Sequence, residues 1–163
     1  MTEFGYTLFS ELNGPKELVH QAQQAEDVGF DFAVISDHFH PWLSSHTDSP
    51  FAWSVLGAVA ERTSSMKLAT LVTCPMVRYH PAIIAQAVAT IQIMSDGRFT
   101  LSVGAGENLN EHVVGRGWPA VDVRHEMLGR IDRGDPRSME RRLRHLPREA
   151  RHGRGRADLF DAR

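Results

Sequence analysis

The chain has 163 residues, of which 42% are hydrophobic and 23% are charged, and its formal net charge is −2. This composition is that of a globular domain with a core of its own, and the charge favours neither nucleic acid nor a membrane surface as a partner. No apolar run reaches the roughly 18 residues that a membrane-spanning helix needs, and no secretory signal opens the sequence. The one cysteine, Cys74, excludes an internal disulfide. We therefore expect a cytoplasmic protein.

The N-terminal part of the chain predicts a strand, a helix and a second strand. Residues 3–8 can form the first strand. Pro15 predicts the start of the helix, because proline at the first helical position has no N–H to leave unpaired, and Gly29 is placed for a left-handed C-terminal cap. The short apolar run at residues 32–35 predicts a second strand that is buried on both faces.

The same alternation continues after a polar loop. Ser49 predicts the N-cap of a second helix, with Pro50 in its first turn. Further elements are expected as a strand at 67–73, a helix that starts at His80-Pro81, a strand at 99–103, and two short helical pieces near 108–114 and 121–128.

This order of elements predicts an α/β fold with a parallel sheet. Right-handed crossovers place the C-terminal end of every strand at one edge, which is where (β/α)₈ barrels and open doubly wound sheets bind ligands. Four strands in the first 128 residues match the spacing of strands in an eight-stranded barrel of about 250 residues. We therefore expect the N-terminal half of a TIM barrel, about four βα units. The shared edge would collect the pairs Ser10-Glu11, Asp37-His38, Thr73-Cys74 and Gly106-Glu107.

The last part of the chain differs from the rest. Residues 1–129 carry 7 Lys and Arg against 14 Asp and Glu, whereas residues 130–163 carry 11 Arg against 6 acidic residues. The second segment has no apolar stripe to bury. We therefore expect one folded unit at residues 1–129, and a disordered tail or the product of a shifted reading frame at residues 130–163.

Asp37 and His38 form the most reactive pair at the predicted edge. An imidazole titrates near neutral pH, so His38 could take a proton as a hydride leaves a substrate carbon; the alternative is a solvated loop histidine. His38, His40, His46 and Asp48 match no compact zinc pattern, and we expect no metal site.

Other residues at this edge allow a functional and a purely structural interpretation. Trp42 could form a wall for a flat ring or anchor its loop. Glu107 follows Gly104, Ala105 and Gly106, where small residues let a large cofactor approach the backbone, although a tight turn with a surface carboxylate has the same pattern. Asn110 could share the helical face of Glu107 or simply cap a helix.

Three further residues lie near the end of the third strand. Thr73 and Cys74 could face a ligand or belong to core and turn packing, and no adjacent base marks the Cys74 thiol as a nucleophile. Arg78 precedes the third helix, where it could contribute to an anion site or lie beside an ordinary capped helix start.

Three motifs, at residues 36–42, 75–81 and 104–111, resemble the luciferase-like flavin and deazaflavin oxidoreductases. Within these, the chain is most similar to the coenzyme F420-dependent glucose-6-phosphate dehydrogenase family, over about residues 6–128. The resemblance implies a TIM barrel with F420 in its C-terminal mouth. It also implies a non-proline cis peptide where the third strand bulges toward the ring, which here is Leu71–Val72.

The resemblance also assigns roles to individual residues. His38 would remove the substrate hydroxyl proton, Trp42 would shield the charged intermediate, and Glu107 would be the proton donor near the deazaflavin. Asp37 would contact the deazaflavin and hold His38. The remaining cofactor contacts that it implies are Val72, Thr73, Cys74, Asn110 and the backbone of Gly106.

The family resemblance therefore predicts an F420-dependent oxidoreductase that transfers hydride between an alcohol or sugar-phosphate-type substrate and the deazaflavin. Residues 130–163 contain no counterpart of strands five to eight of the family. The alternatives are an FMN-dependent luciferase-like monooxygenase and an inactive half-barrel fragment. We expect a small-molecule substrate, neither nucleic acid nor membrane as a partner, and a homodimer if the chain folds, since a second copy would cover open strand edges.

Overall fold

The structure is a computed structural model that describes residues 2–132. The predicted tail, residues 130–163, lies outside this range apart from its first three positions. The strands are β1 (Gly5–Leu8), β2 (Phe32–Ile35), β3 (Lys67–Thr70) and β4 (Phe99–Thr100). The helices are α1 (Pro15–Asp27), α2 (Ala52–Arg62), α3 (Pro81–Met94), α4 (Asn108–Glu111), the 3₁₀ helix η1 (His112–Val114) and α5 (Val121–Asp132).

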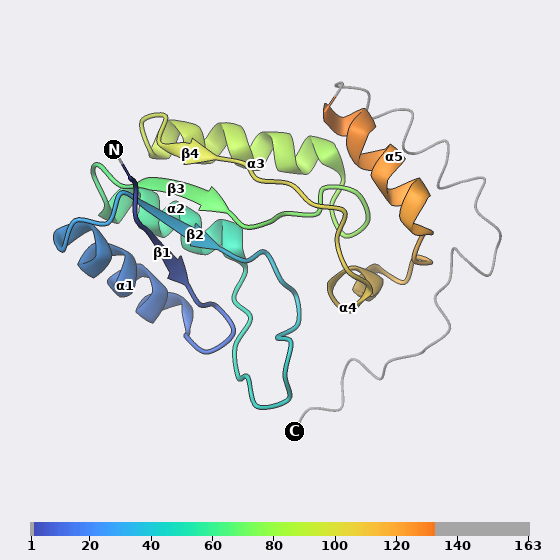
Figure 1. Cartoon of the computed structure of the whole chain (residues 1–163), viewed down its shortest axis with the longest axis horizontal. Helices are drawn as coiled ribbons and strands as arrows, with labels where there is room; N and C mark the ends of the chain where they lie inside the picture. The colour runs from blue at the N-terminus through green and yellow to red at the C-terminus, as the bar shows by residue number, and fades with distance from the viewer. Residues whose placement is uncertain (1, 133–163) are drawn as a thin grey trace.

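The four strands form one parallel sheet in the order β1-β2-β3-β4, with α1, α2 and α3 as the connections between them (Figure 1). Leu8 of β1 is paired with Ile35 of β2, which is paired with Thr70 of β3. A strand order that follows the chain order is the arrangement of successive βα units in a barrel. The predicted fold class, a half-barrel of four such units, is confirmed.

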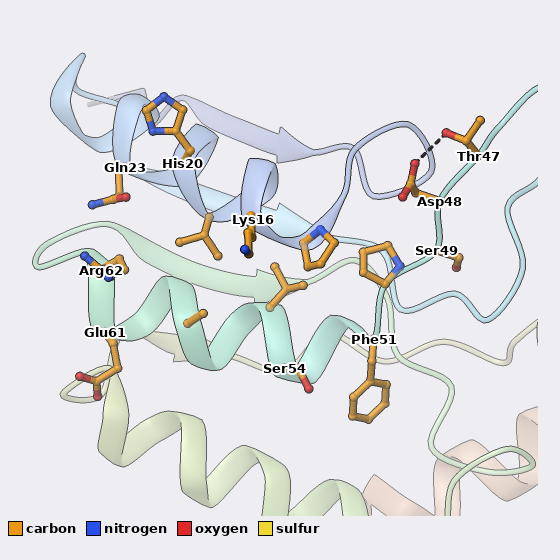
Figure 2. Close-up of a pocket in the computed structure, with 15 residues that line it drawn as sticks. Lys16, His20, Gln23, Thr47, Asp48, Ser49, Phe51, Ser54, Glu61 and Arg62 are labelled. Atoms are coloured by element: carbon orange, nitrogen blue, oxygen red, sulfur yellow. Dashed lines mark hydrogen bonds between the residues drawn. The ribbon is translucent and has the colours of Figure 1, made fainter.

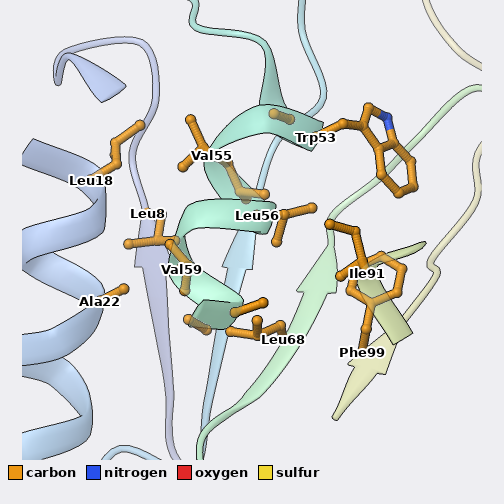
Figure 3. Packing of buried hydrophobic residues seen from close by; sticks show 14 of the residues in the cluster. Leu8, Leu18, Ala22, Trp53, Val55, Leu56, Val59, Leu68, Ile91 and Phe99 are labelled. Atoms are coloured by element: carbon orange, nitrogen blue, oxygen red, sulfur yellow. The ribbon is translucent and has the colours of Figure 1, made fainter. Parts of the chain in front are cut away.

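The helices cover one face of the sheet and enclose the core (Figure 3). Leu56 and Val59 of α2 pack with Leu68 of β3, and Leu18 of α1 packs beside Leu8 of β1. Burying each leucine contributes about 1.5–3 kcal/mol, so this layer accounts for much of the folding free energy. The first two helices bury one face each, with Leu18, Ala22 and Ala25 in α1 and with Ala52, Val55, Leu56, Val59 and Ala60 in α2.

Several details of the predicted elements are wrong. The third strand ends at Thr70 rather than at residue 73, and the fourth ends at Thr100 rather than at residue 103. In β2 only Ala33 and Ile35 are buried, while Phe32 and Val34 are half-buried, because the helices of the described residues cover one face of the sheet. The second helix begins at Ala52 rather than at Pro50. Ser49 is not its N-cap, because the Ser49 hydroxyl instead donates to the main-chain carbonyl of His38 at 3.1 Å.

The third strand has the geometry that the resemblance implied. Regular pairing of β3 ends at Thr70, and a single parallel bridge follows between Thr73 and Val103. The peptide bond between Leu71 and Val72 is cis. The chain therefore leaves the regular ladder for a short stretch at the C-terminal end of the sheet.

The last helices lie beyond the C-terminal ends of the strands, away from α1 (Figure 1). Met127 of α5 packs with Cys74, Met76 and Val77 of the loop that follows β3. This second cluster joins α5 to the edge of the sheet. No helix within residues 2–132 is long and apolar enough to cross a membrane.

Candidate active site

A cavity of about 260 Å³ opens at the C-terminal edge of the sheet. It collects residues from the ends of three strands, as the alternation of strands and helices predicted. Eight of the nine predicted site residues border it, and the exception is Thr73. The lining residues are Asp37, His38, Trp42, Leu71, Val72, Cys74, Gly104, Ala105, Gly106, Glu107, Asn110 and Glu111.

The His38 imidazole lies between two carboxylates. Its Nδ1 is 2.6 Å from Glu11 Oε1, and its Nε2 is 3.8 Å from Glu107 Oε1. Glu11 is buried, and the Ser10 hydroxyl donates to its other oxygen at 3.3 Å. An ionised carboxylate only accepts hydrogen bonds, so Glu11 fixes the proton of neutral His38 on Nδ1 and leaves Nε2 as the proton acceptor.

Glu11, rather than Asp37, therefore holds His38, so this part of the role predicted for Asp37 is wrong, whereas its contact with the deazaflavin stays a prediction. The Asp37 carboxylate is already occupied, because it accepts from Trp53, Thr73, Arg78 and Tyr79. Glu11 follows β1 and lies 27 residues from His38 in the sequence. Its place at the predicted edge was the signal that could have identified it.

Trp42, Glu107 and Asn110 form the outer wall of the cavity. The Trp42 indole N–H donates to Glu107 Oε1 at 2.9 Å, and the Trp42 ring lies 5.0 Å from the His38 ring, tilted by 40°. Asn110 Nδ2 donates to the same Glu107 oxygen at 2.6 Å. Asn110 Oδ1 accepts from the main-chain N–H groups of Phe39 and His40 at 2.7 and 2.8 Å. The buried Asn110 amide thus joins Glu107 to the loop that carries His38 and Trp42.

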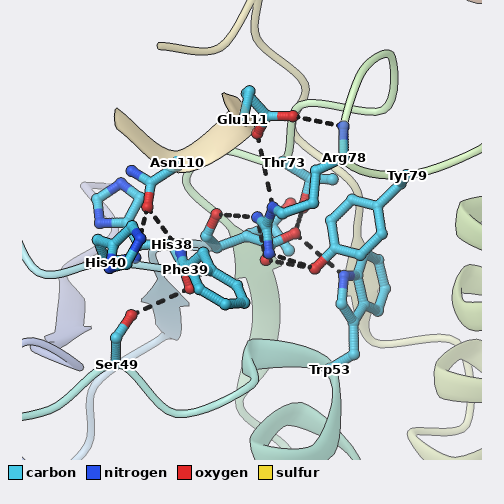
Figure 4. Close-up of polar contacts among 12 residues, drawn as sticks. His38, Phe39, His40, Ser49, Trp53, Thr73, Arg78, Tyr79, Asn110 and Glu111 are labelled. Atoms are coloured by element: carbon cyan, nitrogen blue, oxygen red, sulfur yellow. Dashed lines mark hydrogen bonds and ion pairs between the residues drawn. The ribbon is translucent and has the colours of Figure 1, made fainter. Parts of the chain in front are cut away.

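Asp37 is the centre of a buried hydrogen-bond network, and Figure 4 labels its partners Trp53, Thr73, Arg78 and Tyr79. Its Oδ2 accepts from Trp53 Nε1 at 3.1 Å and from the Thr73 hydroxyl at 2.9 Å. Its Oδ1 accepts from Arg78 Nη2 and from the Tyr79 hydroxyl, each at 2.9 Å. Burial, followed by the charge of Asp37, raises the pKa of Tyr79, so its hydroxyl remains a donor.

Two further members of this network are charged: Glu111, which was not predicted as a site residue, and Arg78, for which the sequence suggested at most an anion site. Glu111 Oε2 accepts from the main-chain N–H of Arg78 at 2.7 Å, and Glu111 Oε1 lies 3.6 Å from Arg78 Nε. Burial raises the pKa of Glu111, and Arg78 opposes that rise. Burial alone would lower the pKa of Arg78, but the neighbouring Asp37 carboxylate keeps it raised. Arg78 therefore does not form the anion site that its position before α3 allowed.

Thr73, Cys74 and Gly106 form the floor beneath the cavity. Thr73 is buried with its hydroxyl bonded to Asp37, so its side chain supports the site and is not exposed to a ligand there. Burial raises the pKa of the Cys74 thiol to about 12, which excludes a reactive thiolate near neutral pH. Gly106 has a φ of +71°, and a Cβ at this position would lie 2.5 Å from Cys74 Sγ.

The remaining histidines of the loop do not gather into a metal site. His40 stacks on His112 of η1 with ring centroids 5.9 Å apart, and burial, followed by the charge of His112, lowers the pKa of His40. His46 packs edge-on against Phe9. Within residues 2–132, no three His, Cys, Asp or Glu side chains are placed to hold one metal ion.

A larger cavity, of about 930 Å³, lies between α1 and α2 on the helical side of the sheet (Figure 2). Its charged residues carry both signs, with Lys16 and Arg62 opposed by Asp48 and Glu61. None of the predicted site residues borders it. Size alone therefore does not identify the site, and the convergence of polar groups favours the smaller cavity.

Comparison with known proteins gives a consistent family match. The family model described as luciferase-like monooxygenase matches residues 2–129. An F420-dependent glucose-6-phosphate dehydrogenase of Amycolatopsis mediterranei is 46% identical over 129 residues, which are 78% of this chain and 39% of that protein. The corresponding protein of Nakamurella multipartita is 47% identical over 125 residues, 77% of this chain and 37% of that protein. The chain thus spans about two fifths of the length of these curated relatives.

Solved structures show the same fold. An F420-dependent secondary alcohol dehydrogenase in complex with an F420-acetone adduct superposes with a TM-score of 0.75 at 39% identity, covering 89% of this chain and 42% of that one. The coenzyme F420-dependent tetrahydromethanopterin reductase of Methanopyrus kandleri gives a TM-score of 0.60 at 31% identity, covering 72% of this chain and 31% of that one.

Proposed function

This chain belongs to the luciferase-like monooxygenase family, and we propose that its C-terminal-edge cavity binds the deazaflavin ring of coenzyme F420, with His38 as the base in hydride transfer from an alcohol carbon. The observation that carries the proposal is the His38 imidazole, held by Glu11 with its Nε2 toward a cavity that Glu107 and Trp42 border. The F420-dependent relatives named above support the choice of cofactor.

The residues around the cavity fit a flat ring with a polar rim. Leu71 and Trp42 expose more than half of their side-chain surface, at 55% and 57%, and Val72 is also exposed, so apolar surface is available to cover both faces of a ring. At about 260 Å³ the cavity is near the lower end of the range for small-molecule sites, about 300–1,000 Å³. It would therefore hold the ring, with the rest of the cofactor outside it.

Within this arrangement His38 has one clear task. F420, when bound, supplies a hydride acceptor that also takes up one proton. His38 Nε2 receives the proton of the substrate hydroxyl while the alcohol carbon gives up its hydrogen as a hydride, which leaves a carbonyl product. The imidazolium that forms is stabilised by the Glu11 carboxylate at Nδ1 and, once Glu107 has given its proton to the ring, by the Glu107 carboxylate 3.8 Å from Nε2.

Glu107 and Trp42 complete the proposed site. Glu107 Oε1 is fixed by two donors, Trp42 Nε1 and Asn110 Nδ2, so its carboxyl group is held at the rim, where it can exchange a proton with the ring. Trp42 contacts the His38 ring and excludes water from one side of it. Among the described residues, neither Lys nor Arg borders the cavity. We propose an alcohol or sugar-phosphate-type substrate, and the F420-dependent relatives named above support both substrate classes.

We also propose that the chain associates as a homodimer. In the described residues, β1 and β4 are the outer strands of the sheet, and each pairs on one side only. Open edges of this kind favour pairing with another copy. Sedimentation velocity of the full chain would show a dimer, and a monomer across the accessible concentration range would contradict this part of the proposal.

The cofactor assignment is tested by fluorescence titration of the full chain with F420 and, separately, with FMN. We expect saturable binding of F420 and weaker binding of FMN. An alcohol series that includes 2-propanol then tests reduction of bound F420, with His38→Asn as the variant that binds the ring but does not turn over. Preferential FMN binding would support the monooxygenase alternative, and a folded chain that binds neither would support an inactive half-barrel.

A further inference from the structure

Arg78 lies behind the cavity, between the segments that form it. Its side chain is only 7% exposed, and it is not among the lining residues. Arg78 Nη2 donates to the main-chain carbonyl of Asp37 at 2.6 Å and to Asp37 Oδ1 at 2.9 Å. Nη1 donates to the Tyr79 hydroxyl at 2.8 Å. On the other side, the main-chain N–H and the Nε of Arg78 face the carboxylate of Glu111.

These contacts join three separate segments of the chain (Figure 4). Asp37 directly precedes His38 at the end of β2, Arg78 belongs to the loop between β3 and α3, and Glu111 is the last residue of α4. Glu107 is the N-cap residue of that same helix. One guanidinium therefore connects the segment that carries His38 to the helix that carries Glu107.

The position of α4 depends on such connections. The helix has four residues, Asn108–Glu111, and a single turn is far too short to be stable by itself. Two residues of α4 hold it in place. The Asn110 amide oxygen accepts from the main-chain N–H groups of Phe39 and His40, and the Glu111 carboxylate accepts from the main-chain N–H of Arg78 and lies 3.6 Å from Arg78 Nε. The first contact is uncharged and lies at the rim, whereas the second is charged and lies beneath the cavity.

We propose that Arg78 is a positioning residue of the F420 site, which sets the distance between His38 and Glu107 through its contacts with Asp37 and Glu111. The inference rests on the proposed function, because it concerns the geometry of that site. Arg78 touches neither of the two residues that it positions. It acts by holding their segments in one arrangement.

The chemistry of the contacts requires an arginine. A guanidinium presents several donors in one plane, and Arg78 uses them toward Asp37 and Tyr79 while Nε faces Glu111. A lysine ammonium keeps the charge but cannot reach all of these groups at once. Arg78→Lys should therefore leave the buried carboxylates Asp37 and Glu111 with a cation nearby and keep the main-chain bond to Glu111, while the guanidinium link between Asp37 and Glu111 is lost and the position of α4 shifts.

Arg98 offers a matched control at the opposite edge of the sheet. Its guanidinium donates four hydrogen bonds, against three from that of Arg78, to the carbonyls of Ala60, Thr63 and Met66 and to the Thr63 hydroxyl, where α2 ends and β3 begins. Arg98→Lys should lower the melting temperature without changing the cavity. A change that appears in R78K and not in R98K therefore cannot be attributed to lost stability alone.

The experiment compares wild type, R78K, R98K and Glu111→Gln, each as the full chain at a temperature where all are folded. In the protein without ligand, the ¹H–¹⁵N signals of the histidine rings are recorded, and His38 is assigned with H38N. We expect R78K and E111Q to shift the His38 ring signals, and R98K to leave them in place. F420 affinity should fall roughly three- to tenfold in R78K and E111Q, the effect of one or two poorly placed contacts, and remain at the wild-type value in R98K.

The two readouts separate this inference from the proposed function. Failure of wild type to bind F420 would overturn the proposed function, and the His38 signals would still decide the role of Arg78. Unchanged His38 signals and unchanged F420 affinity in R78K and E111Q would show that Arg78 serves stability alone. Equal changes in R78K and R98K would lead to the same conclusion.

Discussion

Replacing Gly106 with alanine should place a methyl group in steric conflict with Cys74 and Glu111 at the floor of the cavity. Gly106 has a φ of +71°, in the left-handed region that side chains other than glycine rarely adopt. The added Cβ would also lie 2.5 Å from Cys74 Sγ, 3.0 Å from Cys74 Cβ and 3.3 Å from Glu111 Cγ. The first of these distances requires movement of the β3–α3 loop or of the segment after β4.

The expected cost follows from these two effects. The left-handed conformation costs a residue with a side chain about 1–2 kcal/mol, and overpacking of a filled site costs about 1–3 kcal/mol. The sum, about 2–5 kcal/mol, corresponds to a fall in melting temperature of roughly 4–20 °C for a chain of this size. Gly29 provides the control, because its φ is +92° but no atom lies within 4 Å of its Cβ position. Gly29→Ala should therefore show the conformational cost alone.

Thermal unfolding followed by circular dichroism measures the difference between the two variants. Addition of Cys74→Ala to G106A removes the sulfur at 2.5 Å and should recover part of the lost stability. The double variant should then be more stable than the sum of the two single effects predicts. F420 affinity should fall in G106A and not in G29A. The reasoning is refuted if G106A and G29A lower the melting temperature equally, since the close approach of Gly106 to Cys74 would then be absent in solution.

Two further predictions concern carboxylates at opposite edges of the sheet. Burial alone would raise the pKa of Glu26, but the main-chain N–H groups of Ser65, Met66 and Ser64 keep it below its usual value of 4.5. Ionised Glu26 therefore stabilises the fold above pH 4.5, and this stabilisation disappears as the pH falls through the lowered pKa. Glu26→Gln should reduce stability at pH 7 and weaken the loss of stability at acid pH in a denaturation series, and an unchanged loss at acid pH would contradict this. Glu11→Gln removes the charge beside His38 Nδ1 and should slow F420 reduction by about 10- to 150-fold, with F420 affinity nearly unchanged. This factor is the kinetic equivalent of a hydrogen bond to a charged group, which contributes about 1.5–3 kcal/mol. A variant that loses affinity but not rate would show that Glu11 shapes the cavity instead of orienting the base.

The sequence predicted the location of the site better than its internal contacts. Alternating strands and helices place the ends of parallel strands together whatever the side chains are, so the meeting of His38, Glu107 and Gly106 followed from topology alone. The partner of His38 depends on which side of the β2 exit each side chain faces. Adjacency in the sequence favoured Asp37, whereas the extended backbone turns Asp37 toward Trp53 and leaves His38 to Glu11.

Long-range ion pairs were the least predictable part of the site. Arg78 is 41 residues from Asp37 and 33 from Glu111, and its place before a helix pointed equally to an anion site. Only the packed structure shows that the guanidinium donates to Asp37 and Tyr79 and lies beside Glu111. The local signal at Ser49 also failed. A serine before a proline predicts a helix cap, but the Ser49 hydroxyl donates to the main-chain carbonyl of His38 instead.

The central claim is that separate strands direct His38 and Glu107 toward one cavity that holds the F420 ring. Titration of the full chain with F420, followed through the histidine ¹H–¹⁵N ring signals, tests it most directly. We predict that the His38 signals shift in proportion to F420 bound, while those of His20, which borders the cavity between α1 and α2, stay in place. Saturable F420 binding that moves His20 and leaves His38 unchanged would contradict the claim.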